Sequence, residues 1–294
     1  MGLIFNPASE IIIIMNQNLT SEYNEVMKNP DQYLDGIKHK FDGHQILLVT
    51  GFLAETLIKV SGYFDDQMKW FDESGIDYRR IKLESENSTA ANAKVIVETI
   101  KNSKKPVYII SHSKGGLDTL DALLSHPVQW IKVKGWITVQ TPFYGTAIVD
   151  ILLGNPVSSS LIKKLLTDFF CGEEASVEDM RTQKRKDLQT RNKADIQKIL
   201  EAIPVVSFAS DAGNILTPLA LIRDIVAKEE GGNDGLVSLK SGKLEGSDFV
   251  RIRGVDHAMT VMEWPWPLSS TIKKFNRVDF IKALLYLLLK QKMA

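Results

Sequence analysis

The chain has 294 residues, in which 36 lysines and arginines balance 36 aspartates and glutamates. This balance gives no overall field that would attract nucleic acid or an anionic membrane, so no nucleic-acid partner is expected. Cys171 is the only cysteine, which excludes an intramolecular disulfide, a zinc ribbon and a Cys-x-x-Cys redox site.

The apolar runs of the sequence do not have the pattern of a signal peptide or a transmembrane helix. The runs 3–5 and 11–15 are separated by polar residues, and no basic residue precedes Lys28. The run 283–289 near the C-terminus is too short to cross a bilayer. We therefore expect a cytoplasmic protein without a transmembrane segment, and an unusual export route is the alternative.

The first predicted core element is the strand 45–50, whose continuous apolar run is typical of a strand buried on both faces. A helix over 65–74, a short strand over 78–83 and a helix over 88–102 follow it. This alternation predicts a mostly parallel sheet with crossover helices, and such sheets bind ligands at the carboxyl ends of their strands.

The stretch 106–124 is the one that points to chemistry. An apolar strand passes through the pentapeptide 111–115, Ser-His-Ser-Lys-Gly, into a helix-like segment. A serine at such a sharp turn needs small residues two positions before and after it, because strand and helix crowd those places. Ser111 and Gly115 meet this need, so Ser113 is the candidate nucleophile. A small-residue turn without chemistry is the alternative.

The pentapeptide is a variant of the Gly-x-Ser-x-Gly nucleophile elbow, and the chain resembles the alpha/beta-hydrolase superfamily. In similar lipases the strand that corresponds to 45–50 usually ends in His-Gly, and the next residue donates its backbone N–H to the oxyanion hole. Here Thr50 replaces that histidine, whereas Gly51 and Phe52 match. The predicted oxyanion donors are the backbone N–H groups of Phe52 and Lys114. The Lys114 side chain is not expected to act as a base, because adjacent residues at a turn point apart.

A second match follows the predicted strand 133–139. The run 141–146, Thr-Pro-Phe-Tyr-Gly-Thr, is similar to a loop of bacterial triacylglycerol lipases, and we expect it at the rim of the site. The alternation then stops over 147–203, which we interpret as a helical cap or lid facing an acyl-binding cleft. Ordinary core packing and a solvated charged helix are the alternatives. The predicted substrate-binding residues are Leu53, Phe143, Leu161 and Leu165.

The acid of the site is predicted in the run 233–237, Asn-Asp-Gly-Leu-Val, which closely resembles the acid-bearing turn of the lipase families. Asp234 also fits a tight turn, which is its structural alternative. Its place after the late strand 204–209 suits a carboxylate that holds a histidine in one tautomer. Asp211, on the loop directly after that strand, is the competing candidate.

His257 is the candidate general base, because histidine has an ordinary pKa near neutrality. Two of the five histidines precede the strand 45–50, His112 is expected to point away from Ser113, and His126 ends the elbow helix. Only His257 follows the acid turn, in the Ser…Asp…His order of alpha/beta-hydrolases. Calcium-dependent bacterial lipases carry an aspartate two residues further on, where this chain has Met259, so we predict no metal and no cofactor.

These observations predict an α/β protein with an alpha/beta-hydrolase core over 1–146 and 204–294 and a helical cap over 147–203. They favour a serine hydrolase that cleaves carboxylic esters with apolar acyl chains, a lipase or esterase. The expected partner is a small-molecule or lipid ester, with lipid-interface contact through the cap. A thioesterase, phospholipase or acyltransferase would use the same residues, and a non-catalytic binding protein of this fold is the contrasting alternative.

Overall fold

The computed structural model describes residues 16–35, 38–52, 62–84, 86–154, 174–264, 272 and 274–291. Within these residues, six strands form one parallel sheet in the order β2-β1-β3-β4-β5-β6. The predicted α/β architecture with a parallel central sheet is therefore confirmed. The strands are β1 (Gln45–Val49), β2 (Tyr78–Arg80), β3 (Val107–His112), β4 (Val133–Val139), β5 (Val205–Asp211) and β6 (Asp248–Arg253).

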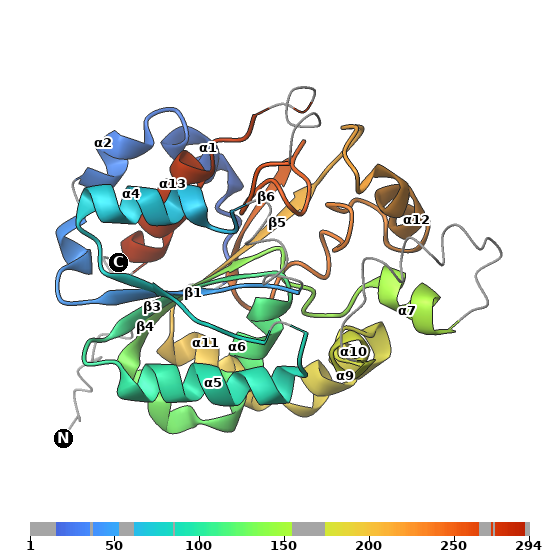
Figure 1. Ribbon diagram of the computed structural model, residues 1–294, viewed down its shortest axis with the longest axis horizontal. Helices are drawn as coiled ribbons and strands as arrows, with labels where there is room; N and C mark the ends of the chain where they lie inside the picture. The colour runs from blue at the N-terminus through green and yellow to red at the C-terminus, as the bar shows by residue number, and fades with distance from the viewer. Residues whose placement is uncertain are drawn as a thin grey trace, which may run out of the picture.

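Helices cover both faces of this sheet (Figure 1). One layer contains α1 (Thr20–Val26), α2 (Pro30–Asp35), α4 (Asp65–Ser74) and α13 (Arg277–Lys290). The opposite layer contains α5 (Thr89–Asn102), α6 (Lys114–Ser125) and α11 (Lys193–Ala202). Strand residues alternate between the two layers: Ile46 and Leu48 pack in the core with α13, whereas Leu47 packs in the core with α5 and α6. A strand buried on both faces needs the continuous apolar run seen in the sequence.

The segment 147–203 contributes both to the region beside the sheet and to the sheet's own helical layer. It contains α7 (Ala147–Gly154), α9 (Glu174–Glu178) and α10 (Thr182–Arg191), whereas α11 packs against α6. Because α11 connects β4 to β5 in the layer of α5 and α6, it is a crossover helix of the core, although the sequence analysis grouped it with the cap. The predicted apolar stripe over 157–170 lies outside the described residues.

Polar contacts hold α9 and α10 against the core. The Thr89 amide donates to Asp179 Oδ2 at 2.6 Å, and Asp179 also pairs with Lys184 at 2.7 Å. The buried Arg185 guanidinium lies 3.4 Å from Asp121 on α6. This part of the insertion therefore contacts α5 through the Thr89 amide and α6 through the Arg185–Asp121 ion pair.

The remaining described elements are short or lie at the periphery. They are η1 (Lys38–Phe41), η2 (Pro127–Lys132) and α12 (Ala220–Glu230).

None of the helices in the described part of the chain has the length and apolar character that crossing a bilayer would need.

Candidate active site

Ser113 stands at the turn between β3 and α6 in a backbone conformation that L-residues rarely adopt, with φ 55° and ψ −133°. A Cβ at Gly115 would lie 2.3 Å from the Thr50 carbonyl oxygen and 2.8 Å from that of Val49. Glycine is therefore required there, because the helix passes directly over the end of β1. This crowding is the reason that the sequence analysis gave for the small residue, and it directs Ser113 out of the sheet.

The side chains of Ser113, His257 and Asp234 form a continuous hydrogen-bonded row. His257 Nε2 lies 2.9 Å from Ser113 Oγ, and His257 Nδ1 lies 2.9 Å from Asp234 Oδ2. Because a carboxylate only accepts, Nδ1 carries the proton and Nε2 is left to accept from the Ser113 hydroxyl. The three predicted residues thus come together with the histidine in the tautomer that a base requires.

The turn around Asp234 explains how the carboxylate is aimed. Asp234 Oδ1 accepts the backbone amides of Leu236 at 2.9 Å and Val237 at 2.8 Å, and Oδ2 remains for His257. Asp234 is 1% exposed, so this interaction is sheltered from water. The turn role and the histidine-orienting role are therefore compatible, because they use different oxygens.

The competing acid, Asp211, has other partners. Its Oδ1 accepts the Gly213 amide at 2.9 Å, and its Oδ2 lies 3.2 Å from Arg253 Nε on β6. Asp211 therefore stabilises a loop and an ion pair at the strand ends. Of the two aspartates, only Asp234 contacts the His257 ring.

The predicted oxyanion donors belong to segments that flank Ser113. A Cβ at Gly51 would lie 2.6 Å from the Ser113 Cβ, so the chain leading from β1 to Phe52 passes beside the serine. Lys114 is the first residue of α6, and the first amides of a helix have no intrahelical acceptor. The Lys114 ammonium is buried and bound to Asp118 at 3.0 Å, which agrees with the expectation that this side chain is not a base.

An apolar cavity of about 90 Å³ adjoins Ser113 and His257. Its walls include Phe52, Pro142, Met180, Leu236, Val261 and Trp264. Phe143 is not among the residues that line it: the ring is fully buried and packs edge-on against Trp136, with centroids 5.9 Å apart. The neighbouring Pro142 lines the cavity, and a substrate contact of Phe143 stays a prediction. Leu53, Leu161 and Leu165 lie outside the described residues.

Esterases and lipases of known structure resemble this chain in fold. No family model and no curated protein matches the sequence. A metagenomic carboxyl esterase of known structure matches with a TM-score of 0.67 and 21% identity, over 84% of this chain and 76% of that chain. The mature form of a Bacillus licheniformis lipase matches with a TM-score of 0.61 and 21% identity, over 72% and 84%. Lipase 1 from Pelosinus fermentans matches with a TM-score of 0.56 and 12% identity, over 83% and 98%.

This chain has the alpha/beta-hydrolase fold. The fold implied by the sequence resemblance is thereby confirmed. Fold alone does not carry function, because the same alpha/beta-hydrolase scaffold hosts many activities. An activity therefore depends on the side chains of Ser113 after β3, Asp234 after α12 and His257 after β6.

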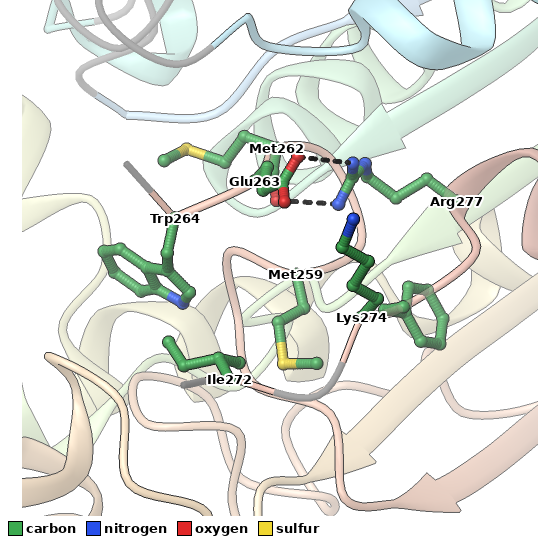
Figure 2. Close-up of a pocket in the computed structure, with 8 residues that line it drawn as sticks. Met259, Met262, Glu263, Trp264, Ile272, Lys274 and Arg277 are labelled. Atoms are coloured by element: carbon green, nitrogen blue, oxygen red, sulfur yellow. Dashed lines mark hydrogen bonds and ion pairs between the residues drawn. The ribbon is translucent and has the colours of Figure 1, made fainter. Parts of the chain in front are cut away.

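A second cavity of about 190 Å³ is shown in Figure 2. Met262 and Trp264 line this cavity and the one at Ser113, so they form part of the wall of both. The Trp264 indole N–H donates to Asp256 Oδ2 at 2.9 Å, which fixes the ring in that wall. On the far side Arg277 reaches Glu263, with 3.8 Å between the charged groups. Trp264 is thus a site-lining residue that the sequence analysis did not identify.

His112 is the other residue whose place was not foreseen. Within the described residues its side chain makes no hydrogen bond to Ser113. Its ring is buried, however, and its centroid lies 4.7 Å from that of His257. Burial, together with the nearby His257, holds the pKa of the His112 imidazole well below its usual range. A neutral histidine under the site has one donor and one acceptor to place, and both are used.

Proposed function

We propose that this protein is a serine hydrolase that cleaves carboxylic esters with apolar acyl groups. The observation that carries the proposal is the row from Asp234 through His257 to Ser113, with 2.9 Å at each contact, beside an apolar cavity. A hydroxyl, a neutral imidazole and a carboxylate in this order form the arrangement that activates a serine oxygen. The esterase and lipase structures that share the fold support the same reaction class.

In the proposed acylation step, His257 accepts the Ser113 proton as the serine oxygen attacks the ester carbonyl carbon. The carbonyl oxygen becomes negatively charged, and the backbone amides of Phe52 and Lys114 donate to it. Asp234 stabilises the imidazolium that forms. The intermediate then collapses: His257 returns the proton to the leaving alcohol, and the acyl group remains on Ser113.

Deacylation repeats these steps with water. His257 takes a proton from water, hydroxide attacks the acyl carbon, and Ser113 leaves with the proton that His257 returns, which frees the carboxylic acid. The same sequence would cleave a thioester, so the cavity decides the substrate. Its largely aliphatic and aromatic walls favour an apolar acyl group. Met180, from the segment that we interpret as a cap, is part of those walls and supports a covering role for that segment.

A fluorophosphonate probe tests the nucleophile directly, because it forms a stable bond only with an activated serine. We expect mass spectrometry to find one label on the wild-type protein, on Ser113, and none on Ser113→Ala. Ser125→Ala is the matched control, because this exposed serine ends the same helix α6 and should not affect labelling. A folded wild-type protein that takes no label would overturn the proposal and favour a non-catalytic binding protein.

The substrate class is tested with 4-nitrophenyl esters of increasing acyl length, assayed below and above the concentration at which they form an interface. We expect the wild-type protein to hydrolyse these esters and Ser113→Ala to lose this activity. A rise in rate once the interface forms would identify a lipase, whereas the absence of a rise would identify an esterase. Preference for acyl thioesters of the same length over the oxygen esters would contradict the ester assignment.

A further inference from the structure

His112 and Tyr63 connect two parts of the site that follow different strands of the sheet, the segment after β1 and the loop after β6. The Tyr63 hydroxyl lies 3.0 Å from the Gly51 amide nitrogen and 2.5 Å from His112 Nδ1. On the other side of its ring, His112 Nε2 lies 3.0 Å from the main-chain carbonyl oxygen of His257. Gly51 follows β1 and His257 follows β6, so these two side chains bridge the predicted oxyanion segment and the histidine loop.

The direction of every proton in this bridge follows from which groups can only accept. The His257 carbonyl accepts, so His112 Nε2 carries the proton and Nδ1 is the acceptor. Tyr63 must then donate its hydroxyl proton to Nδ1, and its oxygen accepts the Gly51 N–H. The Gly51 N–H thus donates to Tyr63, the Tyr63 hydroxyl to His112 Nδ1, and His112 Nε2–H to the His257 carbonyl oxygen.

Gln140 fixes the same arrangement from the end of β4. Its amide nitrogen lies 3.0 Å from the Asp256 carbonyl oxygen, so the nitrogen donates and Gln140 Oε1 faces His112 Nε2 as a second acceptor at 3.2 Å. Gln140 is fully buried and has φ 52°, an uncommon conformation for a residue other than glycine. A buried network in which all polar groups are paired is rigid, because breaking one bond leaves a desolvated partner.

We propose that Tyr63 is a positioning residue for the reaction: its hydroxyl fixes the Gly51–Phe52 segment and, through His112, ties that segment to His257. This inference rests on the proposed ester hydrolysis. The tie matters because the oxyanion donor and the base act on the same substrate group, and displacements of about 1 Å at a site can reduce rates by about 100-fold. Tyr63 is also a lining residue of the cavity, and Tyr63→Phe can test its hydroxyl separately because it keeps the aromatic ring.

Tyr63→Phe separates these roles, because phenylalanine keeps the ring in the cavity wall and removes only the hydroxyl. We expect kcat to fall by about tenfold to 100-fold with KM changed by less than about threefold, since transition-state contacts are loosened and ground-state packing is kept. Rates are expressed per active site, titrated with a fluorophosphonate, so that a smaller folded fraction does not count as a slower enzyme. An unchanged kcat per titrated site would overturn the proposal.

The matched control is Tyr23→Phe. Tyr23 is also buried, on α1, and its hydroxyl has no hydrogen-bond partner within the part of the chain that the structure describes. Removing this hydroxyl should leave both kcat and KM within about twofold of the wild type. An equal loss of kcat in both variants would show a general effect of losing a buried hydroxyl and would contradict a specific role for Tyr63.

The tautomer of His112 gives a readout that needs no turnover. In protein labelled with ¹⁵N-histidine, with His112→Asn used to assign the signal, we expect a neutral imidazole protonated on Nε2 in the wild type and a shifted Nδ1 resonance in Tyr63→Phe. A wild-type His112 protonated on Nδ1 would disprove the bridge. A wild type that has the expected tautomer but hydrolyses no ester would instead refute the proposed function, so the two failures are distinguishable.

Discussion

His257 and Asp234 are joined twice. Their side chains meet at 2.9 Å, and the His257 main-chain N–H donates to the Asp234 carbonyl oxygen, also at 2.9 Å. The loop after β6 is therefore fastened to the acid turn by its backbone as well as by its imidazole. A change confined to the Asp234 carboxylate should consequently leave the loop in place and alter only the electrostatics and tautomer of the ring.

Asp234→Asn uses this property. The asparagine oxygen can still accept the Leu236 and Val237 amides, but its NH₂ group would donate to His257 Nδ1 and force the proton onto Nε2, the nitrogen that must accept from Ser113. We expect kcat for ester hydrolysis to fall by about 10⁴-fold, with unchanged circular dichroism. Asp211→Asn, the matched control, should keep activity. Loss of activity in that control and not in Asp234→Asn would reverse the assignment of the acid.

Gly115→Ala tests the crowding at the elbow. The added methyl would lie 2.3 Å from the Thr50 carbonyl oxygen, and backbone cannot move aside as a flexible side chain would. We expect a loss of about 2 kcal/mol or more in the free energy of unfolding, measured with urea, and a lower kcat because the end of β1 must shift. Gly154→Ala on α7 is the control, since a Cβ there meets no atom of the described residues within 4 Å. Equal stability of the two variants would contradict the tight approach.

The sequence predicted the local parts of the site and missed the long-range ones. The elbow at Ser113 and the turn at Asp234 are set by neighbours within a few positions, so their residues could be identified from short patterns. The bridge through His112 could not, because its partners lie 49 residues away at Tyr63 and 145 residues away at His257. In the irregular loop after β4 no period decides which side chain faces the cavity, so the sequence did not single out Pro142.

The buried pair of Lys114 and Asp118 makes stability depend on pH. The ammonium lies 3.0 Å from Asp118 Oδ1, and Asn92 donates to Oδ2, also at 3.0 Å. Burial nevertheless outweighs these contacts and raises the pKa of the Asp118 carboxyl to about 7. Between about pH 4, the ordinary pKa of aspartate, and pH 7, the native state therefore holds a proton that the unfolded state has lost.

The sign of the effect follows from this difference in bound protons. The native state is favoured at low pH, and the Asp118 contribution to stability is lost as pH rises from about 4 to 7. Relative to Asp118→Asn, which does not titrate, the wild type should lose up to about 4 kcal/mol of unfolding free energy over this range, since each pKa unit is worth about 1.4 kcal/mol. Urea titrations of both proteins at pH 4.5, 6 and 7.5 measure it. A difference that is constant, or that grows in favour of the wild type, would show that the Lys114 charge dominates.

Trp264 is expected to limit the length of the acyl group, because with Met262 it lines both the cavity at Ser113 and the second cavity. Trp264→Ala would remove the largest side chain of this shared lining and is expected to open a path from one space to the other. We expect the ratio of kcat/KM for a ten-carbon ester to that for a four-carbon ester to rise by about tenfold, which corresponds to about two further CH₂ groups buried at about 0.8 kcal/mol each. Trp264→Phe is the control: it loses the bond to Asp256 but keeps a ring in the wall, so its ratio should stay near that of the wild type. The same rise in both variants would attribute selectivity to the lost hydrogen bond, and no rise in Trp264→Ala would show that the acyl group does not extend toward this wall.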